Sequence, residues 1–325
     1  MCFPSALQDE MTMRFSGTLF RRKSLGVEIG PAGAAFALLG GSSTNPCLER
    51  VAFRPLAPGA LRPSLREANI TDPQAFCDCL REAHSQLLQG GTMLSVTLPD
   101  AVGRVLLMDV EGRFKNRAEG LDIIRWKLKK SMPLDVGDTH LDYQKLRVSE
   151  NNDMLLLVSL VSRSVIGQYE DLIAAAGLVP ARIDLNLFNL YRTFERRLSL
   201  QDECTLISFY GNSLSIMIMA DGVPEFIRVK ELPGVSPHDG RVYREICNSL
   251  LAYRERFPER IPQGVTCIAA PEAAPGFRDM VSEALAGETL LLEAKSAVTP
   301  LVDAPADQAT LFPFTAAIGA ALRSL

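Results

Sequence analysis

The sequence predicts an α/β fold that consists of two related halves, and three observations support this prediction. Each half begins with three consecutive strand patterns. In each half a glycine-containing turn follows the first strand, at Gly30 and at Gly211. Helical and strand patterns then alternate to the end of each half. A pattern that recurs along a chain indicates duplication, and alternating helices and strands indicate sheets with parallel neighbours.

The first half opens on residues 24–41, which we interpret as two strands joined by a tight turn. Leu25, Val27 and Ile29 alternate toward one side, and Gly30 and Gly33 permit positive φ. Such a turn can gather backbone N–H groups around a phosphate, and a buried hairpin without a ligand is the alternative. Further strands of this half are expected over 47–56, 93–98, 104–110, 140–148, 154–161 and 179–184, and helices over 73–87, 121–128, 164–176 and 187–198.

The second half repeats this opening. Gly211, Asn212 and Ser213 form the turn after its first strand, and Asp221-Gly222 is a strong hairpin signal before its third strand. Strands are expected over 204–209, 214–220, 223–229, 265–269 and 289–293, and helices over 241–257, 277–285 and 314–325.

Length and composition indicate a globular protein in a reducing compartment. With 325 residues, of which 47% are hydrophobic and 22% charged, the chain can bury the cores of two domains without disulfides. The net charge of −4 argues against non-specific binding of nucleic acid. The seven cysteines lack zinc-type spacing, because Cys77 and Cys79 have no second pair. The longest apolar run, 154–161, is far shorter than the roughly 20 residues of a membrane helix, so we expect a cytoplasmic protein.

The duplicated plan is the layout of the actin-like (ribonuclease H-like) fold, in which two related domains face each other across a nucleotide cleft. Within that fold the sequence resembles the PilM family, the cytoplasmic actin-like component of type IV pilus assembly. Four segments carry the resemblance in the same order. They are a basic leader running into an LGVEIG strand at 19–30, a helix, proline stop and LDY strand at 124–143, an AAAGLVP segment with the strand after it at 174–184, and the ending IGAALR at 318–323.

The resemblance implies how the chain divides into domains. Residues 1–23 would be a disordered basic leader, and 24–200 a first actin-like domain with a small α+β subdomain inserted at about 91–161. Residues 201–325 would form the second actin-like domain. Family members insert another small subdomain between its third strand and next helix, where it helps to enclose adenine. Only 232–240 spans that gap here, so this subdomain is expected to be missing.

The resemblance also implies where a nucleotide would bind. The phosphate turns would contain Glu28, Gly30 and Gly33 in the first half and Gly211, Asn212 and Ser213 in the second. Both turns are retained in the sequence, so an active actin-like ATP-binding protein or ATPase in pilus biogenesis, or a sugar-kinase-type enzyme, is the alternative function.

Several positions nevertheless depart from the family's pattern. Glu28 replaces an aspartate, Pro31 lacks the N–H group of the usual serine, and Ala35 replaces a frequent basic residue. Phe209 stands where the second aspartate is expected, and Ala270-Pro271 replaces a glycine pair near the adenosine. We therefore expect no catalytic residue, no metal site and no bound cofactor, with ATP and Mg²⁺ as the alternative ligand.

The expected function is that of a non-catalytic scaffold. By resemblance, the protein would bind the cytoplasmic tail of a PilN-like inner-membrane protein and other pilus platform proteins. It would lie in the cytoplasm, peripheral to the inner membrane, and would touch the membrane only indirectly.

A basic helix offers candidate residues for partner binding, namely Arg125, Trp126 and Lys129. Trp126 is offset from the apolar stripe of this helix, so an exposed side chain could anchor a partner peptide. Packing of Trp126 in a core is the alternative.

Overall fold

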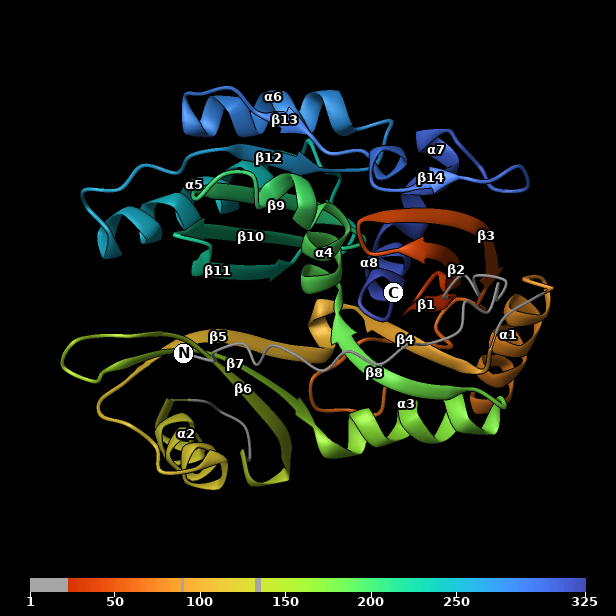
Figure 1. Ribbon diagram of the computed structural model, residues 1–325, viewed down its shortest axis with the longest axis horizontal. Coiled ribbons are helices and arrows are strands. Elements are labelled where there is room, and N and C mark those ends of the chain that lie inside the picture. Colours follow the sequence, from red (N-terminus) through yellow and green to blue (C-terminus); the bar gives the residue numbers. More distant parts are fainter. Residues whose placement is uncertain (1–22, 89–90, 132–135) are drawn as a thin grey trace, which may run out of the picture.

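The computed structural model describes residues 23–88, 91–131 and 136–325, which form two lobes and a smaller third unit (Figure 1). Lobe I is built on a six-stranded sheet, lobe II on a five-stranded sheet and the third unit on a three-stranded sheet. The order of strands is β14-β3-β2-β1-β4-β8 in lobe I and β11-β10-β9-β12-β13 in lobe II. In both lobes an antiparallel three-stranded meander is followed by two parallel strands, which is the duplication that the sequence predicts.

Lobe I combines the start of the chain with two later segments. Its strands are β1 (Ser24–Gly30), β2 (Gly33–Ser42), β3 (Asn45–Pro55), β4 (Met93–Leu98), β8 (Val179–Leu185) and β14 (Thr299–Pro300). Its helices are α1 (Pro73–Ser85), α3 (Arg163–Ala175), α4 (Asn186–Leu198), α7 (Gln308–Leu311) and α8 (Thr315–Leu322), with short 3₁₀ turns at Asp100–Val102, Ala294–Ser296 and Phe312–Phe314.

The local sequence signals of lobe I form the strand and the helix start that they predict. Val27 and Ile29 of β1 are fully buried in a core with Phe76 of α1 and Tyr169 of α3. Helix α1 begins at Pro73 because the Asp72 side chain caps it, accepting a hydrogen bond from the N–H of Ala75 over 3.0 Å. The proline of the expected helix stop, Pro133, lies outside the described residues, as does the leader up to residue 22.

Lobe II has its own core. It contains β9 (Cys204–Tyr210), β10 (Ser213–Ala220), β11 (Val223–Glu231), β12 (Val265–Ile268) and β13 (Leu290–Leu291), with α5 (Gly240–Arg256) and α6 (Ala274–Leu285). Ile207 and Phe209 of β9 pack with Ile246 of α5 and Phe277 of α6, while α4 covers the other face of the sheet. β11 ends at Glu231 and α5 begins at Gly240, and the short segment between them contains no helix or strand.

The third unit is inserted into lobe I and begins later than the expected residue 91. It consists of β5 (Gly103–Val110), α2 (Arg117–Ser131), a 3₁₀ turn (Val136–Asp138), β6 (Thr139–Val148) and β7 (Met154–Ser162), in the sheet order β5-β7-β6. β4 belongs to lobe I instead, because it pairs in parallel with both β1 and β8. Leu94, Val96 and Leu98 are all buried, as is typical of a central strand.

The end of the chain also departs from the expected boundary, since it returns from lobe II to lobe I. β14 pairs with β3, and α8 packs against β1 and β2 through Ala317 and Ala321. All residues of α8 are buried, so this helix needs neighbours on every side. It therefore lies between the sheet of lobe I and α4, and 201–325 is not one domain.

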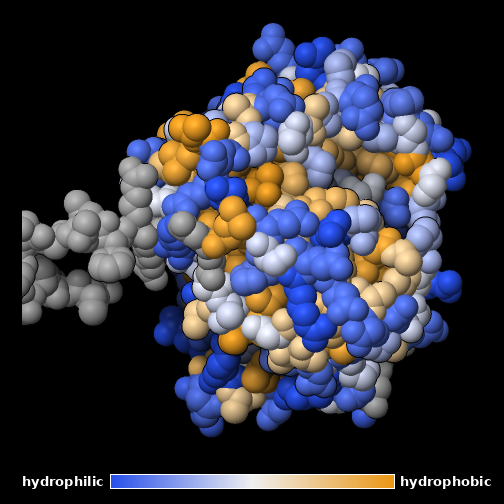
Figure 2. All heavy atoms as spheres, turned by 90° about the vertical axis from the view of Figure 1, so that its right-hand side faces the viewer, coloured by the Kyte–Doolittle hydropathy of each residue, from blue (hydrophilic) through white to orange (hydrophobic). Residues whose placement is uncertain are grey.

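The outer side of lobe I, with α1, β3 and β14, faces the viewer in Figure 2. Hydrophobic and hydrophilic side chains are interspersed on this face. The exposed Phe53 of β3, for example, is followed by Arg54, which forms an ion pair with Glu82 of α1 over 2.9 Å. Among the residues that the structure describes, every helix is too short or too polar to cross a membrane.

Candidate functional site

The two glycine turns lie at the carboxyl ends of the first strands of the two lobes, where ligands bind in open α/β sheets. Gly33 has a φ of +149° and Gly211 a φ of +59°. A Cβ atom on Gly33 would lie 2.0 Å from the carbonyl oxygen of Arg54 on β3. Gly33 is therefore required by the packing of the hairpin itself, whether or not a phosphate binds.

Glu28 lies between the lobes, and both of its carboxylate oxygens accept hydrogen bonds. The hydroxyl of Tyr210, at the end of β9, donates to Oε2 over 2.6 Å. The side-chain amide of Asn186, at the start of α4, donates to Oε1 over 3.2 Å. Thr97 of β4 orients this amide by donating to its Oδ1 over 2.8 Å. Glu28 thus joins lobe I to lobe II through protein groups, at the place where the resemblance implies phosphate and metal chemistry.

Asp100 follows β4 at the same end of the sheet. Its Oδ1 accepts a hydrogen bond from the N–H of Leu187, in the first turn of α4, over 3.0 Å. Burial raises the pKa of both carboxyl groups, Glu28 and Asp100, to about 7. The hydrogen bonds from Tyr210 and Asn186 oppose the rise of the Glu28 pKa, and the N–H of Leu187 opposes that of Asp100. Both groups are consequently only partly ionised at neutral pH.

The second turn faces a carboxylate of its own lobe. The hydroxyl of Ser213 donates a hydrogen bond to Glu231 of the neighbouring strand β11. The carbonyl oxygen of Asn212 accepts a hydrogen bond from the N–H of Leu232 over 2.7 Å. A triphosphate at this turn would be repelled by the carboxylate of Glu231, which has Arg104 nearby as a cation.

The prediction that Phe209 occupies the position of a second aspartate is wrong. Ser213 pairs with Tyr210 in the second hairpin, as Gly33 pairs with Gly30 in the first. Tyr210 is therefore the counterpart of Gly30, and Ser208, two residues earlier, is the counterpart of Glu28. Phe209 points into the core of lobe II, where its ring lies 6.4 Å from that of Phe277. The residue that faces the other lobe is its neighbour Tyr210, because successive side chains of a strand point to opposite sides.

Sequence reasoning missed the four residues that complete this site, namely Asp100, Asn186, Tyr210 and Glu231. Each lies at the end of a predicted strand or the start of a predicted helix, and this position is the signal that could have found them. No group of three or more histidine, cysteine, aspartate or glutamate side chains in the described part of the chain is arranged to hold a metal ion.

The candidate partner residues lie far from the turns, on α2 at the outer side of the inserted unit (Figure 1). Trp126 is 60% exposed, so the alternative that it packs in a core is wrong. The ammonium group of Lys130 lies 3.8 Å from the centre of its ring. Arg125 forms an ion pair with Asp122 over 3.6 Å, and Lys129 is exposed.

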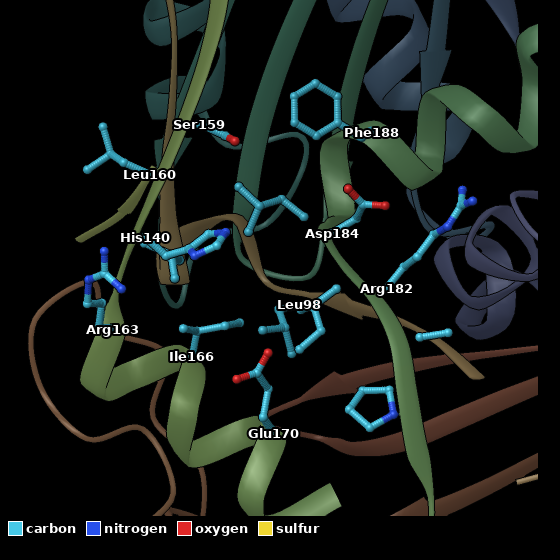
Figure 3. Close-up of a pocket in the computed structure, with 15 residues that line it drawn as sticks. Leu98, His140, Ser159, Leu160, Arg163, Ile166, Glu170, Arg182, Asp184 and Phe188 are labelled. Atoms are coloured by element: carbon cyan, nitrogen blue, oxygen red, sulfur yellow. The ribbon is translucent and has the colours of Figure 1, made fainter. Parts of the chain in front are cut away.

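A groove of about 400 Å³ separates the inserted unit from lobe I, and the sequence did not predict it (Figure 3). His140 of β6 lies on one wall, and Arg163, Ile166 and Glu170 of α3 lie on another. The third wall is β8, the last strand in the sheet of lobe I, which has a neighbour on one side only. An unpaired strand edge that lines a groove can accept an extended peptide.

Comparison with solved structures identifies the architecture. The chain is similar to a chain of the PilM-PilN type IV pilus biogenesis complex, with a TM-score of 0.77 and 20% identity over 94% of this chain and 99% of that chain. It has the actin-like fold of PilM. No family model matches the sequence, and no curated protein sequence matches it.

Two further similarities are more distant than that to PilM. A Bacteroides thetaiotaomicron protein with an actin-like ATPase fold matches with a TM-score of 0.49 and 9% identity, over 88% of this chain and 96% of that chain. The cytoplasmic domain of EpsL, from the type II secretion system of Vibrio cholerae, matches with a TM-score of 0.46 and 13% identity, over 77% of this chain and 82% of that chain.

Proposed function

We propose that the protein is a non-catalytic scaffold of a type IV pilus or related secretion platform, and that it binds the cytoplasmic tail of a PilN-like membrane protein. The similarity to the PilM fold over nearly the whole chain is the observation that supports this proposal. Binding to such a tail would hold the protein in the cytoplasm at the periphery of the inner membrane, beside other platform proteins.

The site between the lobes supports the non-catalytic part of the proposal. Tyr210 and Asn186 occupy both oxygens of Glu28, and Glu231 stands beside the second turn. Pro31 leaves the first turn with one N–H group fewer. Nucleotide binding would have to break the hydrogen bond between Glu28 and Tyr210. It would also have to overcome the repulsion between the phosphates and the carboxyl groups of Glu28, Asp100 and Glu231.

Titration calorimetry with ATP and Mg²⁺ tests this part. We expect no saturable heat up to about 1 mM ATP, which corresponds to less than about 4 kcal/mol of binding free energy, and no release of phosphate. Micromolar binding with turnover would establish the alternative, an active actin-like ATPase.

We propose that the tail binds in the groove shown in Figure 3. Its open edge β8 offers backbone groups, and its walls offer both apolar and charged side chains, including Ile166, Arg163 and Glu170. We expect Ala181→Trp, which fills the groove from an exposed position on β8, to abolish co-purification with a PilN-like tail. If Ala181→Trp co-purifies with the tail as well as the unchanged protein does, the tail does not bind in this groove.

The exposed face of α2 is proposed as a second contact with a platform protein. We expect Trp126→Ala to weaken partner binding about tenfold, because large aromatic side chains concentrate binding energy, and to change the free energy of unfolding by less than about 0.5 kcal/mol. Leu251→Ala is the matched control, since Leu251 is an apolar residue on α5 that is 57% exposed. Equal affinities of the two variants, measured by calorimetry with the partner, would remove α2 from the interface.

A further inference from the structure

The face of α2 that points away from the inserted sheet carries a short row of exposed side chains. Ile124 and Leu128 pack in the core of the inserted unit, so the residues on the opposite side of the helix face solvent (Figure 1). Asp122, Trp126 and Lys130 are all exposed there. They lie four residues apart and therefore form one row along this face. The row is available for contact with another molecule.

A shallow hollow of about 610 Å³ lies beside Trp126, on the side of the N-terminus of α2. Two carboxylates, one cation and two large apolar side chains line it, namely Glu119, Asp122, Lys115, Ile123 and Trp126. The Asp122 side chain is 79% exposed, and its ion pair with Arg125 is long, at 3.6 Å, so its carboxylate can accept further hydrogen bonds. The hollow therefore fits a lysine side chain, whose alkyl stem would lie on the apolar residues and whose ammonium group would meet the carboxylates.

The same face of α2 is basic beyond Trp126. Lys129 and Lys130 are exposed, and neither forms an ion pair with a carboxylate among the described residues. The ammonium group of Lys130 lies over the Trp126 ring, and such a contact leaves its positive charge without a counter-charge. Within the part of the chain that the structure describes, α2 is the only α-helix with an acid in its first turn. This division of charge along the helix therefore distinguishes α2 from the other helices.

We propose that a second copy of this chain packs on this face, with the two α2 helices antiparallel across a two-fold axis at Trp126. Asp122 of each copy then faces Lys130 of the other, because these residues lie four positions before and after Trp126. Parallel helices would place like charges opposite each other instead. The face is thus complementary to itself, which favours a second copy over an unrelated protein. The inference rests on the proposed use of α2 as a contact with a platform protein, and it names a second copy as that protein.

The length of α2 determines how strong this association can be. The helix has 15 residues and is therefore about 22 Å long. Two helices of this length offer less surface than the interfaces of stable dimers, so we expect a weak association with a Kd of the order of 10–100 µM. Binding of each copy to a membrane-anchored tail would raise the local concentration of the protein. A weak contact is then sufficient to pair two copies at the membrane.

Sedimentation velocity of the full-length protein, at concentrations that span the expected Kd, tests the proposal. Trp126 is the only tryptophan of the chain, so its fluorescence reports on the same surface. We expect self-association to increase with concentration, together with a shift of the emission to shorter wavelength as the ring becomes buried. Asp122→Lys and Lys130→Glu should each weaken the association at least about tenfold, because the two-fold axis makes every substitution act twice.

The two substitutions combined in one chain should restore the association, because they exchange the members of each ion pair, and a mixture of the two single variants should associate for the same reason. Asp279→Lys, which reverses an exposed charge on α6, is the matched control and should associate like the unchanged protein. Ala181→Trp should also associate normally, so failure of the tail groove and failure of the α2 contact are distinguishable. A monomer at every concentration, association without a change in Trp126 emission, or a combined variant as weak as the single ones would overturn the proposal.

Discussion

Replacing Gly319 with alanine is expected to lower the free energy of unfolding by at least about 3 kcal/mol, the upper range for overpacked sites. A Cβ atom on Gly319 of α8 would lie 1.9 Å from the carbonyl oxygen of Asn189 on α4. This neighbour is backbone, so no rotamer change relieves the contact and the helices must move apart. The movement would also break the hydrogen bond from the Thr193 hydroxyl to the carbonyl of Thr315, now 2.8 Å long. Urea unfolding followed by circular dichroism measures the loss.

Gly167→Ala provides the matched control for this prediction. Gly167 lies inside α3, and a Cβ atom there has no neighbour within 4 Å. Alanine is the better helix former, so we expect this variant to gain about 0.5–1 kcal/mol. If both variants unfold at the same urea concentration, the close crossing of α4 and α8 is not required for the stability of the fold.

Local signals in the sequence were sufficient to predict individual strands and helices of the fold. The alternation of Leu25, Val27 and Ile29 places β1 correctly, and Asp72-Pro73 places the start of α1. These signals depend only on residues that are close together in the chain, so they can be recognised from the sequence alone. The repeated three-strand opening then predicted the duplicated fold, and the similarity to PilM confirms it.

Partners of strands and helices that are distant in the chain could not be predicted in the same way. The pattern of β4 is that of any apolar strand, and nothing in it distinguishes pairing with β1 from pairing inside the inserted unit. α8 follows lobe II in the chain, yet it packs against lobe I. Its nearly uniform apolar sequence was the available sign of burial on all sides.

The candidate site was only partly predictable for a related reason. Glu28 and the two glycine turns were found because they stand in a local pattern. Tyr210 was missed because the position two residues before Gly211 selects Phe209, whereas the packing of β9 turns Phe209 into the core of lobe II and Tyr210 toward Glu28. Asp100 and Asn186 were missed because they approach Glu28 only after β4 and α4 have packed on β1. Whether the turns bind a nucleotide stays a prediction.

The carboxyl groups between the lobes are expected to make stability fall as the pH rises from about 4.5 to about 7. The ordinary pKa values of Glu28 and Asp100 are 4.5 and 3.8, and in the folded protein both are raised to about 7. Between these values the folded protein holds protons that the unfolded chain releases. The stabilisation is therefore complete below the ordinary values and is lost as the pH rises through the folded values, by roughly 3–4 kcal/mol for each group.

Glu28→Gln combined with Asp100→Asn should remove this dependence, because amides stay neutral at every pH. The Tyr210 hydroxyl can keep a hydrogen bond in this variant, since the carbonyl oxygen of Pro313 lies 3.4 Å away as an alternative acceptor. We expect the variant to be more stable than the unchanged protein at about pH 8 and similar to it at about pH 4, as urea unfolding at each pH measures. Asp138→Asn, at an exposed site, should keep the original slope. A slope that persists in the double variant would mean that groups other than Glu28 and Asp100 hold the extra protons of the folded state.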